Sequence, residues 1–131
     1  MSVATRILVV DDEPDVELLI TQQFRRQIRA GEFTFSFARD GEQALTVLQK
    51  DAGFDLMLLD INMPVMDGLQ LLQEIKRDWP HLMVMMVTAY GDDERRRRAG
   101  ELGAVDFLNK PVDFDYLKQR LHAFTSSPSP S

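Results

Sequence analysis

Apolar residues gather along the chain in short runs that end in polar or charged residues. The central run extends from Leu56 to Leu59 and leads directly into Asp60. A continuous apolar run of this length is typical of a strand that is buried on both faces. The strand cannot continue through Met63-Pro64, because proline has no N–H to donate and restricts the residue before it. We therefore expect Asp60 at the carboxyl end of a central strand, where open α/β sheets place their chemistry.

Other apolar runs predict further strands on both sides of the central one. The runs over residues 7–10 and 82–87 are continuously apolar, which again favours strands buried on both faces. By contrast, Phe33, Phe35 and Phe37 alternate with Thr and Ser, which is typical of a strand near a sheet edge. The predicted strands cover residues 6–10, 33–37, 56–60, 82–87 and 105–108.

Between these strands the apolar residues recur every three or four positions, which predicts helices. Pro14 suits the first turn of the first helix, where its missing N–H costs nothing, and Gly31 ends that helix. Asp40-Gly41 turns the chain into the second helix, and Pro80 stops the third. The apolar stripes are Val16, Leu19, Ile20, Phe24 and Ile28; Ala44, Leu45 and Leu48; Leu69, Leu72, Ile75 and Trp79; and Phe114, Leu117, Leu121 and Phe124.

One predicted helix, over residues 92–101, is almost entirely polar. Ala99 and Leu102 are the apolar residues that can anchor it, so we expect it to dock weakly and to shift easily. The helix has four consecutive arginines, residues 95–98. The last three of them follow three acids, residues 92–94, at the i,i+4 spacing that favours ion pairs along a solvated helix. The alternative is a basic stripe that meets acidic groups of a partner.

Strands that alternate with helices predict a parallel sheet covered by helices on both faces, with right-handed connections. At this length the leading topology is the flavodoxin-like, doubly wound (βα)5 fold, in which five parallel strands have the order 2-1-3-4-5. The chain has 131 residues, which fits one such domain. We expect an N-terminal extension over residues 1–5, the folded domain over 6–124, and a disordered Ser/Pro-rich tail or linker over 125–131.

Composition excludes several classes of function. The net charge is −6 and the pI is about 4.8, which argues against direct binding of nucleic acid by this domain. Without any cysteine, the chain has no disulfide, no thiolate metal site and no thiol nucleophile. No apolar run reaches membrane-spanning length and the first residues lack a signal-peptide pattern, so we expect a cytoplasmic protein that does not contact a membrane.

Polar side chains follow four of the predicted strands at their carboxyl ends, which meet at one edge of the sheet. Three of them are carboxylates, which repel one another unless a divalent cation lies between them. An all-oxygen set of this kind suits Mg²⁺, and a carboxylate can also act as a nucleophile that forms an aspartyl-phosphate. A lysine and a hydroxyl can then stabilise the transferring phosphoryl group. The residues are Asp11, Asp12, Asp60, Thr88 and Lys110.

This set resembles the receiver domain of two-component response regulators, the chemotaxis-regulator-like phosphoacceptor domain. The resemblance extends over residues 6–124, and each motif falls at a predicted strand end in the expected order. The matching motifs are Asp11-Asp12, Asp60 with Met63-Pro64 and Asp67-Gly68, Thr88-Ala89, and Lys110-Pro111.

The resemblance implies that Asp60 accepts a phosphoryl group from the phosphohistidine of a sensor histidine kinase or a histidine phosphotransfer protein. It also implies that Mg²⁺, which Mn²⁺ can replace, is bound directly by Asp12, by Asp60 and by the main-chain carbonyl of Asn62. By the same resemblance Asp11 holds a metal-bound water. Contacts to the phosphoryl oxygens are implied for two residues, Thr88 and Lys110.

The resemblance further implies a switch between Thr88 and the aromatic position of the fifth strand, which is Phe107 here. The family commonly has tyrosine there, so a step that uses its hydroxyl is missing from this chain. The peptide bond before Pro111 is cis in the family, which proline makes inexpensive. Asn62 and Tyr90 flank the pocket, and we expect them to tune the lifetime of the phosphoryl group.

In the family the helix over residues 92–101, the fifth strand and the last helix form the surface that controls an output domain or a partner, sometimes through a phosphorylation-linked homodimer. The resemblance also implies that the domain is not an enzyme acting on a separate substrate, and that it catalyses only its own phosphorylation and slow dephosphorylation. One alternative is a degenerate receiver that serves as a docking module without phosphorylation. A less favoured alternative is an aspartyl-phosphate phosphohydrolase of the haloacid dehalogenase type, which needs an acid where this chain has Asn62.

Overall fold

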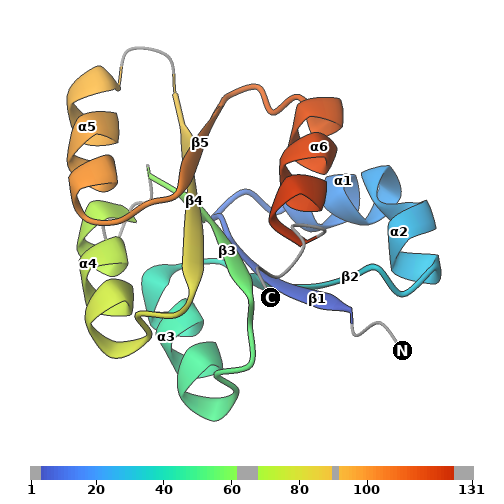
Figure 1. Ribbon diagram of the computed structural model, residues 1–131, viewed down its shortest axis with the longest axis horizontal. Coiled ribbons are helices and arrows are strands. Elements are labelled where there is room, and N and C mark those ends of the chain that lie inside the picture. The colour runs from blue at the N-terminus through green and yellow to red at the C-terminus, as the bar shows by residue number, and fades with distance from the viewer. Residues whose placement is uncertain (1–3, 62–67, 90–91, 126–131) are drawn as a thin grey trace, which may run out of the picture.

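The computed structural model describes residues 4–61, 68–89 and 92–125 (Figure 1). Five parallel strands form one sheet in the order β2-β1-β3-β4-β5, which confirms the predicted flavodoxin-like topology. No helix in the described part of the chain is long and apolar enough to cross a membrane. The strands are β1 (Thr5–Val10), β2 (Phe33–Ala38), β3 (Leu56–Asp60), β4 (Met83–Thr88) and β5 (Asp106–Asn109).

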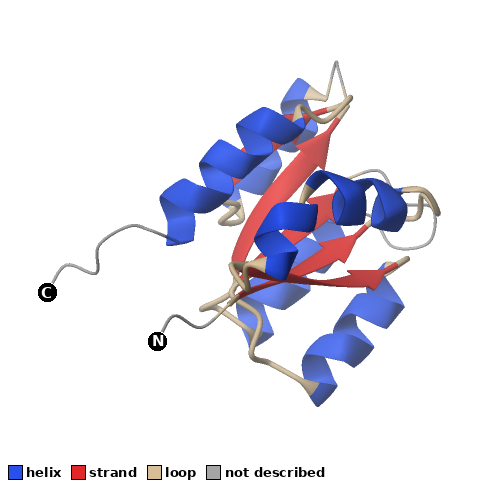
Figure 2. Ribbon diagram, turned by 90° about the vertical axis from the view of Figure 1, so that its right-hand side faces the viewer, coloured by secondary structure: helices blue, strands red, loops and turns tan. Residues whose placement is uncertain are grey.

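Helices cover both faces of this sheet, as predicted (Figures 1 and 2). On one face lie α3, α4 and α5, and on the other lie α1, α2 and α6. The sheet is therefore the middle layer of three. The helices are α1 (Val16–Gln23), α2 (Arg25–Arg29), α3 (Gly41–Lys50), α4 (Gly68–Asp78), α5 (Asp93–Glu101) and α6 (Phe114–Thr125).

The strand side chains divide between two hydrophobic cores because successive residues of a strand point to opposite faces. In β1, Leu8 and Val10 pack in the core beneath α3, α4 and α5, whereas Ile7 and Val9 pack in the core beneath α1 and α6. All four are at most 4% exposed. Burial on both faces explains why the central strands are continuously apolar in the sequence.

The first predicted helix is not continuous. It breaks at Phe24, whose backbone angles (φ −105°, ψ 18°) depart from helical values, so that α1 ends at Gln23 and α2 begins at Arg25. The Phe24 ring is fully buried and packs edge-on against Phe33 of β2, with the ring centroids 5.9 Å apart. The break accompanies this packing against β2. The spacing of apolar residues along the helix does not predict such a contact with another element.

Strands β4 and β5 each end one residue later than the sequence pattern predicts, at Thr88 and Asn109. In the parallel ladder between these strands, Thr88 is the register partner of Asn109. The two residues therefore lie side by side at the carboxyl edge of the sheet.

Candidate functional site

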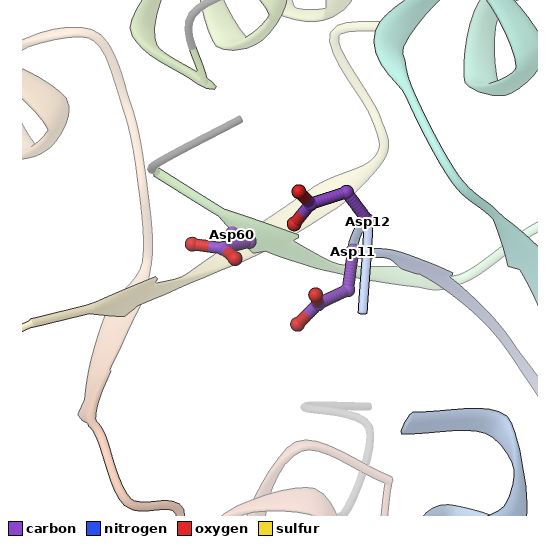
Figure 3. Close-up of side chains that lie close together, drawn as sticks. All are labelled: Asp11, Asp12 and Asp60. Atoms are coloured by element: carbon purple, nitrogen blue, oxygen red, sulfur yellow. The ribbon is translucent and has the colours of Figure 1, made fainter. Parts of the chain in front are cut away.

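The acidic residues predicted from the sequence lie together at the carboxyl edge of the sheet (Figure 3). Asp11 and Asp12 follow β1, and Asp60 is the last residue of β3, which pairs with β1. One carboxylate oxygen from each of the three lies within 4.8 Å of the others. Asp60 is only 1% exposed, whereas Asp12 is exposed and opens the cluster to solvent.

The electrostatics of this cluster favour a bound cation. Burial raises the pKa of the Asp11 carboxyl, and the nearby charges of Asp60 and Asp12 raise it further. The backbone N–H of Glu13 donates to Asp11 Oδ1 at 2.9 Å and opposes this rise. A set of crowded carboxylate oxygens with an open side fits Mg²⁺, which retains several waters when it binds.

Lys110 is the positive charge nearest to Asp60 in the described site. Its Nζ donates to Asp60 Oδ2 at 2.8 Å, and its side chain is 35% exposed. Partial burial lowers the pKa of Lys110, but the hydrogen bond to Asp60 and the charges of Asp60, Asp11 and Glu13 outweigh it and raise that pKa overall. The ammonium therefore stays charged and compensates the buried carboxylate. The peptide bond between Lys110 and Pro111 is cis.

Thr88 is buried at the end of β4, but its hydroxyl faces β5. The hydroxyl donates toward the carbonyl of Leu108 at 3.3 Å and toward Oδ1 of Asn109 at 3.2 Å. The half-buried ring of Phe107 packs against the core on the α5 side of the sheet. Neither residue hydrogen-bonds to Asp60 in this arrangement, so a contact between Thr88 and a phosphoryl group on Asp60 requires rotation of the threonine.

The helix α4 begins against the backbone that carries Asp60. The N–H of Gly68 donates to the carbonyl of Ile61 at 3.2 Å. A Cβ at position 68 would lie 2.7 Å from the carbonyl oxygen of Asp60 and 2.7 Å from Cα of Ile61. This approach is open only to glycine, and it fixes where the chain returns after the strand.

The arginines of α5 follow the predicted solvated, ion-paired pattern only in part. Arg95 donates to the carbonyl of Ile61 at 2.9 Å, and the guanidinium of Arg96 lies 5.0 Å from the Phe107 ring centroid. Arg97 pairs with Glu94 and Glu101, and not with the acid four residues before it. No pattern in the sequence indicates that Arg95, Arg96 and Asn109 belong to the site, because their partners come from distant parts of the chain.

A mostly apolar cavity of about 370 Å³ opens beside the acidic cluster. It lies between α1, α6 and the sheet, with Asp11, Glu13 and Lys110 among its lining residues. Leu19 of α1 also lines it and is 45% exposed, although its spacing predicts a core residue. The neighbouring Leu18 is 61% exposed. Apolar surface therefore adjoins the charged site.

Two predicted site residues, Asn62 and Tyr90, lie outside the described residues, as do Met63, Pro64 and Asp67. Their predicted roles as metal ligand and lifetime-tuning residues stay predictions.

A family model of the response regulator receiver domain matches residues 7–122 of this chain. The chain belongs to this family. It is 34% identical over 119 residues to Sporulation initiation phosphotransferase F of Bacillus subtilis, and the match covers 91% of this chain and 92% of that protein. Receiver domains are signalling modules of two-component phosphorelays that bind Mg²⁺ through acidic residues, and Asp11, Asp12 and Asp60 provide such a cluster here.

Longer relatives contain the receiver domain as one part. The Response regulator protein PilR of Pseudomonas aeruginosa is 37% identical over 114 residues, which cover 87% of this chain but only 24% of that protein. Among solved structures, a response regulator receiver domain protein from Clostridium thermocellum has a TM-score of 0.83 at 26% identity, covering 94% of this chain and 95% of that chain. The chain therefore spans nearly all of some relatives and about a quarter of others.

Proposed function

We propose that this receiver domain accepts a phosphoryl group on Asp60 from the phosphohistidine of a sensor histidine kinase or a histidine phosphotransfer protein. One carboxylate oxygen of Asp60 forms a bond to phosphorus as the bond from phosphorus to the imidazole nitrogen breaks, and the electron pair leaves with the imidazole. The observation that carries this proposal is the ion pair of buried Asp60 with Lys110, 2.8 Å apart, beside the acidic cluster.

Each residue of the site has its own role in the transfer of the phosphoryl group. Asp12, Asp60 and the main-chain carbonyl of Asn62 would hold Mg²⁺, and Asp11 would hold one of its waters. Bound Mg²⁺ supplies charge that offsets the phosphoryl oxygens. Lys110 keeps a second positive charge at Asp60, and Thr88 turns its hydroxyl to a phosphoryl oxygen once transfer has occurred.

The result of transfer is a change in the surface formed by α5, β5 and α6. Rotation of Thr88 alters its contacts with β5, where Phe107 lies. Helix α5 has a single buried residue, Ala99, so little apolar contact resists its movement. We propose that this surface then binds an output domain or a partner differently, or a second phosphorylated copy.

The direct test is incubation with a small phosphodonor, acetyl phosphate, followed by intact mass measurement. The chain should gain the mass of one phosphoryl group when Mg²⁺ or Mn²⁺ is present. The Asp60→Asn variant should gain none, because the amide is not a nucleophile, and it should stay folded because it removes repulsion within the acidic cluster.

Two results would contradict the proposal. If the parent chain binds Mg²⁺ but gains no phosphoryl group, the domain is a docking module that works without phosphorylation. If it releases phosphate from simple phosphomonoesters over many turnovers, it is a phosphohydrolase.

The protein that donates the phosphoryl group binds the exposed apolar surface beside the cavity, which includes Leu19. Replacing Leu19 with aspartate should slow transfer from a phosphorylated kinase or phosphotransfer protein by about tenfold or more, because it places a charge in an apolar contact. Transfer from acetyl phosphate needs no such contact and should change little. The measurement compares the two rates on the same variant.

Val105 offers the matched control for this change. It is 41% exposed, much like Leu19, but it precedes β5 and so lies at the opposite edge of the sheet from Asp60. Val105→Asp should leave both transfer rates unchanged. Equal slowing of protein and acetyl phosphate transfer by Leu19→Asp would mean that the residue supports the site and not the partner.

A further inference from the structure

We propose that Asn109 and Arg96 are positioning residues that hold the Thr88 hydroxyl away from Asp60 and connect its release to Phe107 and α5. This inference rests on the proposed phosphorylation of Asp60 for its functional consequence. The arrangement itself can be tested in the unphosphorylated protein.

The first part of the argument is the contact between Thr88 and Asn109. The two are register partners at the ends of β4 and β5. A threonine hydroxyl has one proton, and here it has two acceptors, the Leu108 carbonyl at 3.3 Å and Asn109 Oδ1 at 3.2 Å. Both distances are long for a hydroxyl donor, so each bond is weak. The side chain is therefore held in place by contacts that a competing acceptor can overcome.

The second part is the link from Asn109 to α5. Nη1 of Arg96 donates to the same Oδ1 of Asn109 at 3.4 Å, and the guanidinium carbon lies 5.0 Å from the Phe107 ring centroid. This places the cation within the range of a cation–π contact. A single amide oxygen thus accepts from the switching hydroxyl and from the cation that covers the ring of the strand-five aromatic.

The aromatic ring at position 107 explains how a change at Asn109 can reach β5. A phenylalanine ring has no hydroxyl that can form a hydrogen bond, but the face of the ring attracts a cation. When Thr88 turns toward a phosphoryl oxygen, Asn109 loses one of its two donors and keeps Arg96. The loss of this hydrogen bond alters the position of Arg96, which contacts both Asn109 and Phe107. Arg96 belongs to α5, a helix with a single buried residue, so the helix can move with it. Arg96 therefore provides the polar contact between Phe107 and Asn109 that the phenylalanine ring cannot make itself.

The first test replaces Asn109 with alanine and measures the side-chain torsion of Thr88 by three-bond NMR couplings to its γ-methyl carbon, without phosphorylation. In the parent, we expect couplings of a single rotamer. In Asn109→Ala, the couplings should shift toward those of a mixture, because one acceptor is gone. Acceptance of a phosphoryl group from acetyl phosphate should become about three- to tenfold faster, as expected for the loss of one weak hydrogen bond.

The second test compares Arg96→Met with Arg98→Met. Methionine keeps an unbranched stem over Phe107 but removes the charge and the donor. Arg98 is an exposed neighbour on the same helix, which makes it the matched control. Arg96→Met should speed amide hydrogen exchange in α5 several-fold and shift the Thr88 couplings in the same direction as Asn109→Ala. Arg96→Lys, which keeps a charge and a donor, should restore part of the parent behaviour.

The outcomes separate this inference from the proposed function. Unchanged Thr88 couplings in Asn109→Ala would overturn the inference, whatever the phosphorylation rate. Equal effects of Arg96→Met and Arg98→Met would overturn the role of Arg96. Parent protein that accepts no phosphoryl group would refute the proposed function, while the couplings and hydrogen exchange would still decide whether the two residues position Thr88.

Discussion

Replacing Lys110 with methionine should lower the free energy of unfolding by about 2–3 kcal/mol near neutral pH, because it removes the positive charge that pairs with the buried carboxylate of Asp60. Asp60 is 1% exposed, and Lys110 Nζ lies 2.8 Å from its Oδ2. The loss is smaller than for a fully buried pair because the Lys110 side chain is 35% exposed. Phosphoryl acceptance from acetyl phosphate should slow by about a hundredfold or more, since a charged donor at the reacting oxygens is lost. Urea unfolding and intact mass measure the two effects.

The control for this prediction is the same change in the Asp60→Asn background. With the carboxylate gone, Lys110→Met should cost little, so that the two changes are strongly non-additive. The raised pKa of Lys110 adds a second check. The stabilisation of the fold by the charged Lys110 is fully present below pH 10.5, its ordinary pKa, and is lost as the pH rises through the higher pKa of the folded state. A loss that persists in Asp60→Asn would show that Lys110 stabilises the fold through its stem and not through its charge.

Replacing Gly68 with alanine should lower the free energy of unfolding by about 2–4 kcal/mol, because the new Cβ overlaps backbone that cannot move aside. The added carbon would lie 2.7 Å from both the Asp60 carbonyl oxygen and Ile61 Cα. Relief of this overlap requires the start of α4 or the end of β3 to shift. Phosphoryl acceptance should therefore fall together with stability, and both can be measured as for Lys110→Met.

Gly100 is the matched control within the described helices. A Cβ there would lie 3.7 Å from Phe107 Cζ, which is ordinary contact. Gly100→Ala should raise the free energy of unfolding by about 0.5–1 kcal/mol, because alanine loses less backbone entropy in a helix. If Gly68→Ala were equally benign, the close approach at the start of α4 would not constrain the site.

The fold was predictable because its pattern is redundant. Continuous apolar strands such as Leu56–Leu59 require cover on both faces, and alternation with helices leaves few topologies that supply it. The acidic cluster followed from the same reasoning. Once β1 and β3 are parallel neighbours, their carboxyl ends bring Asp11, Asp12 and Asp60 together without any further information.

Contacts between elements were not predictable in the same way. Spacing along α5 predicts that Arg96 pairs with Asp92, whereas the structure brings Arg96 to Asn109. Arg95 contacts Ile61, which also belongs to another part of the chain. A polar helix has no apolar stripe that fixes its rotation, so its orientation depends on such individual contacts. The break at Phe24 has a similar origin, since it accompanies packing against β2.

The separation of the two hydrophobic cores has a consequence for how such a domain diversifies. The sheet stands between them, so the cavity beside α1 and the surface around α5 rest on different sets of buried side chains. Under the proposed function, substitutions that change kinase recognition at the face of α1 should leave the packing under the other face intact. On that proposal, related domains can exchange upstream and downstream partners independently, provided that the few residues at the carboxyl edge of the sheet are kept.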